Sequence, residues 1–90
     1  MNGHLETLRR EIDRIDSALA PLLEERMRLS DEIGAYKQKN GIPVRDEARE
    51  EALLVRIRAL VESDCADSVE SVYRAVLAAS RARQNGEETG

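Results

Sequence analysis

Several residue types that proteins commonly use for catalysis or crosslinking are scarce in this chain of 90 residues. It contains one cysteine, Cys65, and one histidine, His4. A single cysteine excludes an internal disulfide framework, and this pair of residues does not supply the ligands of a zinc site. Catalytic triads need a histidine as the proton carrier. We therefore expect neither a metal centre, nor a bound cofactor, nor a His-based triad.

Aromatic residues and long apolar runs are missing as well. The two tyrosines make up the whole aromatic content of 2%. No run approaches the roughly 20 apolar residues that span a bilayer, and no charged start followed by an apolar stretch indicates a secretory signal. The formal net charge of −4 argues against nucleic acid as a partner. We expect one cytoplasmic domain over residues 1–90, with no membrane partner.

What the chain does have is helical periodicity, interrupted by few glycines and prolines. Break signals at residues 40–43 (Asn-Gly-Ile-Pro) and 63–67 separate the apolar segments. They predict an all-α fold of three helices and a flexible tail, over about residues 5–39, 46–62, 68–84 and 85–90. Asp46 or Arg45 would begin the second helix. Asp67 and Glu70 have the spacing of a capping box, which would begin the third.

The first predicted helix carries an apolar stripe in alternating steps of three and four residues, typical of a coiled-coil face. Its members are Leu5, Leu8, Ile12, Ile15, Leu19, Leu22, Leu29, Ile33 and Tyr36. Because the stripe keeps its phase across Pro21, we predict a kink there rather than an end. Such a helix is about 50 Å long, and helices of about 17 residues cannot cover it. We therefore expect an intertwined homodimer with antiparallel long helices.

Polar residues stand where these faces should be apolar. Arg26 occupies one position of the stripe. It either specifies how the helices pack or provides a cation inside the bundle that binds an anion. Lys37 follows three turns later on nearly the same face. Ser80 and Gln84 lie one turn apart on the apolar side of the third helix. Together these groups suit a small polyanionic ligand and a reaction that depends on positioning and electrostatic stabilisation.

In this order and spacing the residues resemble the all-helical (AroQ-type) chorismate mutases over about residues 5–84. The resemblance is carried by LRREIDRID at 8–16, Glu25-Arg26, IGAYK at 33–37, PVRDEARE at 43–50 and SRARQ at 80–84. It implies a three-helix subunit in an intertwined dimer with two equivalent sites. It also implies an isomerase of the shikimate pathway, which feeds aromatic amino acid biosynthesis, converting chorismate to prephenate by a Claisen rearrangement.

The resemblance implies roles for particular side chains. Lys37 and Gln84 would flank the ether oxygen of the substrate and carry the rate, Arg26 would clamp a carboxylate, and Glu50 would hold the ring hydroxyl. The polar shell would be completed by Asp46, Arg49 and Ser80, and the apolar walls by Ile33, Leu53 and Leu77.

Arg9 would reach the site of the partner subunit and bind a substrate carboxylate there. It precedes Arg26 by 17 residues, about 25 Å along a helix and on a different face, so it cannot readily serve its own chain's pocket. Arg81 departs from the family pattern, which commonly has an apolar wall residue there. Its charge would adjust affinity or the preference for a ring substituent.

Three other functions remain open on the sequence. Two use the same scaffold: a mutase acting on 4-amino-4-deoxychorismate and an isochorismate pyruvate-lyase. The run Arg45-Asp46-x-x-Arg49-Glu50 favours a mutase over the lyase. A non-catalytic helical dimerisation module would explain the heptads but leaves Arg26, Ser80 and Gln84 unexplained. No regulatory domain fits, so feedback control would come from a partner protein.

Overall fold

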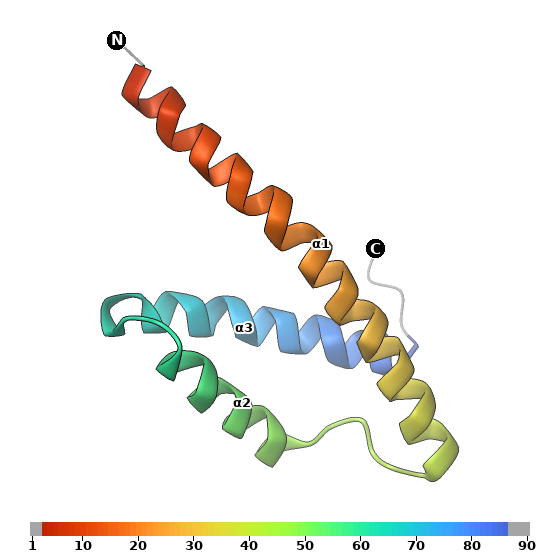
Figure 1. Ribbon diagram of the computed structural model, residues 1–90. Coiled ribbons are helices and arrows are strands. Elements are labelled where there is room, and N and C mark those ends of the chain that lie inside the picture. Colours follow the sequence, from red (N-terminus) through yellow and green to blue (C-terminus); the bar gives the residue numbers. More distant parts are fainter. Residues whose placement is uncertain (1–2, 87–90) are drawn as a thin grey trace.

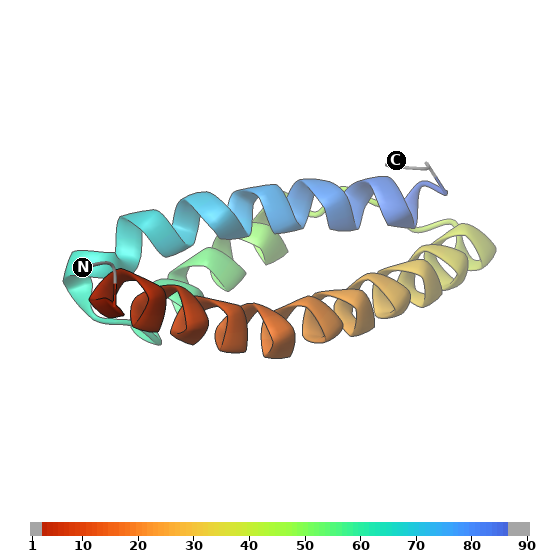
Figure 2. The ribbon, with the colours of Figure 1, turned by 90° about the horizontal axis from the view of Figure 1, so that it is seen from above.

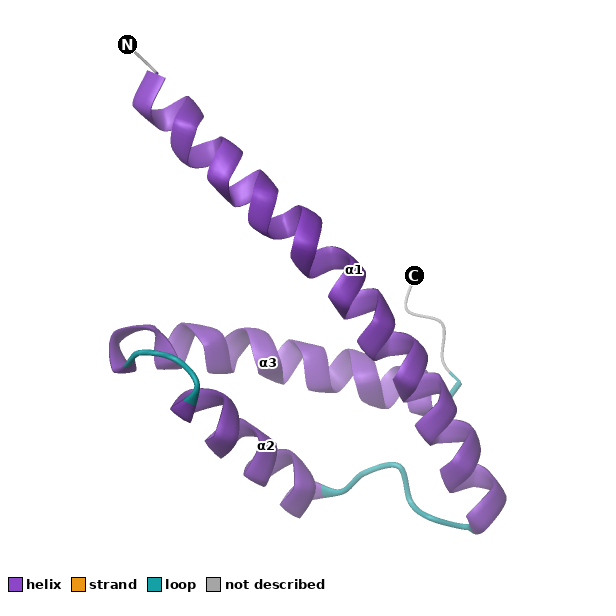
Figure 3. Ribbon diagram, viewed as in Figure 1, coloured by secondary structure: helices purple, strands orange, loops and turns teal. Residues whose placement is uncertain are grey.

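The chain forms an open three-helix arrangement in the computed structural model, which describes residues 3–86. This range contains α1 (Gly3–Asn40), α2 (Glu47–Ala59) and α3 (Ser63–Gln84), and no strand (Figures 1 and 3). The all-α prediction is confirmed. None of these helices combines the length and apolar composition that crossing a membrane requires. α3 packs against both of the other helices, and the buried core lies between α2 and α3, around Leu53, Leu54, Ile57 and Leu77.

α1 runs unbroken through Pro21, so the prediction that this proline does not end the helix is confirmed. Figure 2 shows α1 bowed along its length. The helix ends where Gly41 takes a positive φ of 66°. The Ile42 amide then donates to the Lys37 carbonyl at 2.9 Å and the Gly41 amide to Gln38 at 3.4 Å. This is a Schellman arrangement, and it turns the chain into the loop that leads to α2.

Asp46, one of the two predicted start residues, is the N-cap of α2, and its side chain accepts a hydrogen bond from the Arg49 amide at 3.0 Å. The prediction for α3 is wrong at its start, because the helix begins at Ser63 rather than 68. Residues 63–67, read as a break for their polar character, form its first turn, and Ala66 is buried there. A serine and an aspartate are favourable in a first helical turn, where amides are unpaired.

The capping box predicted from Asp67 and Glu70 is therefore absent. Both carboxylates instead accept from Arg58 of α2, each at 2.9 Å. These contacts tie the two helices together near their connection. α2 ends at Ala59, because the Leu60 amide already bonds to Ile57 at 3.0 Å in a tightened last turn. Of the predicted tail, residues 87–90 lie outside the described residues.

The N-terminal half of α1 stands away from α2 and α3 (Figure 1). The radius of gyration is 16.4 Å, against about 12 Å for a compact domain of this length. All nine residues of the apolar stripe are 43–64% exposed. Within the described chain, the predicted coiled-coil face is formed but not covered.

Candidate active site

An open cavity of about 390 Å³ lies between the C-terminal half of α1, the 41–46 loop, α2 and α3. It brings together ten of the eleven residues that the resemblance implies for the site, namely Arg26, Ile33, Lys37, Asp46, Arg49, Glu50, Leu53, Leu77, Ser80 and Gln84. The eleventh, Arg9, does not line it. Arg9 lies on the projecting half of α1, 3.9 Å from Glu6.

Helical spacing delivers these side chains to one place. On α1, Arg26 and Lys37 are eleven residues apart, three turns of helix, and so share a face. On α3, Leu77 precedes Ser80 by three residues and Gln84 by seven, which again is one face. The two faces meet because α1 and α3 pack together near the C-terminus of each (Figure 1).

Gly34 allows the backbones of these helices to approach closely. A Cβ atom at this position would lie 2.4 Å from the carbonyl oxygen of Gln84 and 2.6 Å from its Cα. Only a glycine fits against backbone at that distance. The contact brings Gln84 next to Lys37, which follows Gly34 by one helical turn.

Lys37 and Gln84 are joined directly at the cavity wall. The Lys37 Nζ donates to Gln84 Oε1 at 3.0 Å and to the Val44 carbonyl oxygen at 2.9 Å. Because an ammonium group has three N–H donors, one remains for a ligand. The same contact fixes the amide of Gln84, whose Nε2 faces Ser80 Oγ at 3.4 Å.

Two buried serines link α1 to α3 beside this pair. Ser30 and Ser80 are 2% and 6% exposed, and their Oγ atoms are 2.6 Å apart. Ser30 was not among the predicted site residues. It follows Arg26 by four residues, so the helical spacing that linked Arg26 to Lys37 also points to it.

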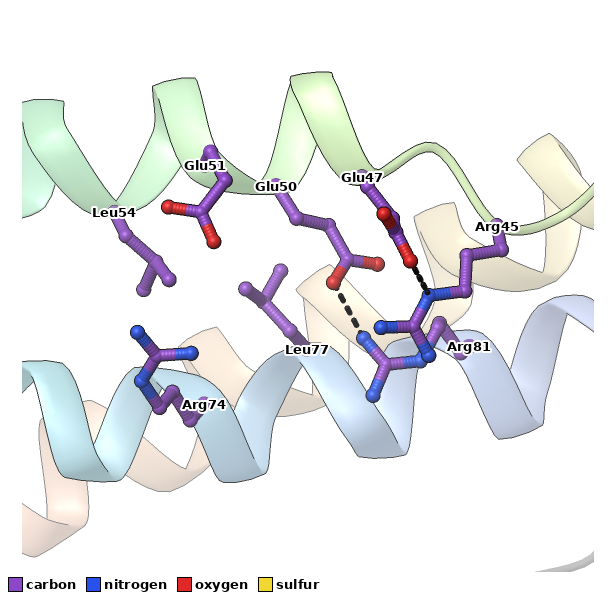
Figure 4. Close-up of a pocket in the computed structure, with 8 residues that line it drawn as sticks. All are labelled: Arg45, Glu47, Glu50, Glu51, Leu54, Arg74, Leu77 and Arg81. Atoms are coloured by element: carbon purple, nitrogen blue, oxygen red, sulfur yellow. Dashed lines mark hydrogen bonds and ion pairs between the residues drawn. The ribbon is translucent and has the colours of Figure 1, made fainter.

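Arg81, where the resemblance led us to expect an apolar wall residue, forms an ion pair with Glu50 at the cavity wall. Its Nη1 lies 2.5 Å from Glu50 Oε1, and both side chains are largely buried. Figure 4 shows this pair from a second cavity of about 320 Å³, which contains Arg74 on the α3 side. Glu50, Leu77 and Arg81 line both cavities, so the ion pair forms part of the wall that they share.

The lining of the first cavity is cationic although the chain is acidic. It has four basic side chains, Arg26, Lys37, Arg49 and Arg81, against two acidic ones, Asp46 and Glu50, an excess of two positive charges. Among residues 3–86, the guanidinium groups of Arg26 and Arg49 take part in no hydrogen bond or ion pair. These two cations are therefore available to an anionic ligand.

An ion pair joins α1 and α3 just outside the cavity. Arg83 of α3 makes two hydrogen bonds to the carboxylate of Asp31 on α1, at 2.9 and 2.7 Å. These bonds raise the pKa of the Arg83 guanidinium above its usual value. Neither residue lines the cavity.

In the part of the chain that the structure describes, no group of three His, Cys, Asp or Glu side chains is placed to hold a metal ion.

Comparison with known proteins identifies relatives along nearly the whole chain. The T-protein of Haemophilus influenzae is 35% identical over 83 residues, which are 90% of this chain and 22% of that protein. The chorismate mutase of Methanocaldococcus jannaschii is 35% identical over 63 residues, 70% of this chain and 64% of that protein. The bifunctional chorismate mutase/prephenate dehydratase of Aquifex aeolicus is 41% identical over 56 residues, 62% of this chain and 16% of that protein.

The chain thus spans about a fifth of the length of the T-protein and under two thirds of that of the archaeal relative. No solved structure matches it. The family described as "Chorismate mutase type II" matches residues 8–85, a range that contains every residue lining the cavity and Arg9. The chain belongs to the type II chorismate mutase family.

Proposed function

We propose that this chain is a chorismate mutase, an isomerase that converts chorismate to prephenate in a homodimer with two shared sites. The observation that carries the proposal is the cavity in which Lys37 and Gln84 meet beside the unpaired guanidinium groups of Arg26 and Arg49. We also infer a cytoplasmic location, since its single cysteine is an exposed free thiol, which reducing compartments preserve.

The charge of the cavity supports a substrate with two carboxylates. An excess of two positive charges balances two anionic groups, and planar guanidinium groups bind carboxylates through paired hydrogen bonds. Arg26 is the partly buried one of the two free cations. We assign it to a carboxylate, with Arg49 and Asp46 in the polar shell at the start of α2.

The hydrogen-bond donors at the cavity wall support a reaction in which charge builds on an ether oxygen. Lys37 keeps one N–H donor after bonding to Val44 and Gln84. Because Oε1 of Gln84 accepts from Lys37, its Nε2 is the end left to donate. The two donors would meet on one oxygen and stabilise the transition state more than the ground state. A pericyclic rearrangement needs no nucleophile.

Glu50 is the acceptor that we assign to the ring substituent of the substrate. Its Oε1 is taken by Arg81, while Oε2 remains to accept a hydrogen bond from a hydroxyl group. Ile33, Leu53 and Leu77 would enclose the ring. The ring then lies between the Lys37–Gln84 pair and the Glu50–Arg81 pair.

The uncovered stripe of α1 supports the dimer. Nine large apolar side chains in line, all 43–64% exposed, are more than a soluble monomer normally leaves in water. A second copy has the matching stripe, as closed twofold dimers require. Arg9 lies on the projecting half of α1, where its one ion-pair partner among residues 3–86 is Glu6, at 3.9 Å, so it is free to reach the partner's cavity.

The activity is tested by following chorismate absorbance with purified protein, beside 4-amino-4-deoxychorismate and isochorismate. We expect prephenate from chorismate. Preferred turnover of the amine would indicate the amino-substrate mutase, and pyruvate release from isochorismate the lyase. A folded dimer that converts none of the three would contradict an enzyme and leave the dimerisation module.

Shared sites are tested by mixing inactive subunits. Arg9→Ala and Arg26→Ala homodimers should each have little activity. In a heterodimer, the Arg9→Ala chain keeps its Arg26 and receives Arg9 from its partner, so one of two sites is complete. Random exchange should restore about a quarter of wild-type activity. No recovery after verified exchange would contradict sites shared between subunits.

A further inference from the structure

Ser30 and Ser80 form a hydrogen-bonded pair that the proposed mechanism has not used. Ser30 Oγ is 2.6 Å from Ser80 Oγ and 3.1 Å from the carbonyl oxygen of Arg26. Both serines are buried and line the cavity. A buried hydroxyl group at 2% exposure has to find its partners inside the protein.

The count of hydrogens allows only two arrangements of this pair. Each hydroxyl has one hydrogen to donate. If Ser30 donates to the Arg26 carbonyl, Ser80 must donate to Ser30, and Ser80 has no hydrogen left. If Ser30 donates to Ser80 instead, the hydrogen of Ser80 is free for a third group.

An anion bound in the cavity favours the second of these two arrangements. A carboxylate only accepts hydrogen bonds, so Ser80 can bind one only in the second arrangement. The Arg26 carbonyl loses little by the change, because it keeps its helical bond from the Ser30 amide. A hydroxyl group that accepts one hydrogen bond also donates a stronger one.

We propose that Ser30 is a positioning residue for anion binding: it donates to Ser80, and Ser80 in turn donates to a substrate carboxylate. This inference rests on the proposed function, since it takes the anion in the cavity to be that of the substrate. In this arrangement Ser80 of α3 contacts the ligand, and Ser30 of α1 orients Ser80. The free guanidinium group of Arg26, one turn before Ser30 on α1, then acts on the same side of the cavity.

The test is a double-mutant cycle with Ser30→Ala, Ser80→Ala and the double variant, measured on chorismate. Ser80→Ala should raise KM by about tenfold or more, as expected for the loss of one hydrogen bond to a charged group. Ser30→Ala should raise KM by less, because Ser80 keeps its own hydrogen and loses only the donor that orients it. In each single variant kcat should change less than KM. In the Ser80→Ala background, Ser30→Ala should have almost no further effect, because the two hydroxyl groups act as one unit.

The matched control is Ser17→Ala. Like Ser30, Ser17 has its hydroxyl group within reach of the carbonyl four residues earlier in α1; it donates to that of Asp13 at 2.8 Å, but it does not line the cavity. Its KM should stay at the wild-type value. Ser30→Cys keeps a hydrogen-bond donor at this position, although a weaker one on a larger atom, and should raise KM by less than Ser30→Ala. It keeps the test available if the alanine variant folds poorly.

Two results would overturn the inference: effects of Ser30→Ala and Ser80→Ala that multiply in the double variant, or an unchanged KM in Ser30→Ala. If wild type does not convert chorismate, the proposed mutase activity fails by itself. Calorimetric titration with chorismate then runs the same cycle on affinity, and absence of any binding to wild type would overturn both proposals.

Discussion

Replacing Gly34 with alanine should separate Lys37 from Gln84, the pair that we propose to be catalytic, while leaving the chain folded. The added Cβ would lie 2.4 Å from the Gln84 carbonyl oxygen, whereas ordinary van der Waals contact begins at 3.4 Å. The obstacle is backbone of α3, so no side chain can rotate out of the way. α1 and α3 therefore have to move apart by about 1 Å at this point.

The Gly34→Ala substitution should affect the catalytic rate more than the stability of the fold. Overpacking costs about 1–3 kcal/mol, and alanine returns up to about 1 kcal/mol through its higher helix propensity. We expect a net loss of at most about 2 kcal/mol in the free energy of unfolding. A displacement of about 1 Å between catalytic groups can cost about a hundredfold in rate, because Lys37 and Gln84 would no longer meet on one oxygen.

The assay compares kcat/KM on chorismate with urea unfolding at a fixed protein concentration, since dimer stability depends on concentration. Gly3→Ala is the matched control, because a Cβ at Gly3 has no neighbour within 4 Å. It should keep wild-type activity. A Gly34→Ala enzyme with wild-type kcat/KM would refute the argument that this helix contact sets the catalytic geometry.

Three further outcomes are expected. Lys37→Ala should keep a native circular dichroism spectrum and lose activity by about 10²–10³, the usual loss on removing one transition-state donor; a near-native rate would remove Lys37 from the mechanism. Arg81→Leu should raise the use of the 4-amino substrate relative to chorismate by about tenfold, because the guanidinium on Glu50 repels a second cation; Arg81→Lys is the control, and an unchanged ratio would contradict this role. Hydrogen bonds from Arg74 and Arg58 lower the pKa of Glu70 below 4.5. The ionised Glu70 therefore stabilises the folded protein above pH 4.5, and this contribution is lost as pH falls through the pKa of the folded state. Between pH 3 and 6, the free energy of unfolding measured in urea should therefore depend less on pH in Glu70→Gln than in wild type. Identical pH dependence in the two proteins would contradict this role of Glu70.

Which residues share a face could be predicted from the sequence, because helical periodicity is a local property. The spacing of Arg26 and Lys37, and of Ser80 and Gln84, placed each pair on one side of its helix before any packing was known. The start of α3 could not be predicted in this way. Residues 63–67 have turn-like side chains, and it is the burial of Ala66 and the pairing of Arg58 across helices that make them helical.

The hydrogen bonds of the site depend on distances between helices, which periodicity does not report. The pairing of Arg81 with Glu50 requires α2 and α3 to lie side by side. The bond from Lys37 to the Val44 carbonyl depends on the path of the loop after Gly41. The close backbone contact between Gly34 and Gln84, which places Lys37 beside Gln84, is likewise not revealed by a single glycine in a helical pattern.

Two residues connect dimer formation to completion of the site. Leu29 and Ile33 belong to the apolar stripe, are 52% and 47% exposed, and also line the cavity. A second copy that covers the stripe would therefore close the cavity as well, and would bring Arg9 to it. Ile15→Glu places a charge in the stripe outside the cavity, where Ile15 is 50% exposed. Burying an unpaired carboxylate costs several kcal/mol, so sedimentation should show monomers. These should have lost most activity although all residues lining the cavity are intact. A monomer with wild-type kcat/KM would show that one chain forms the complete site.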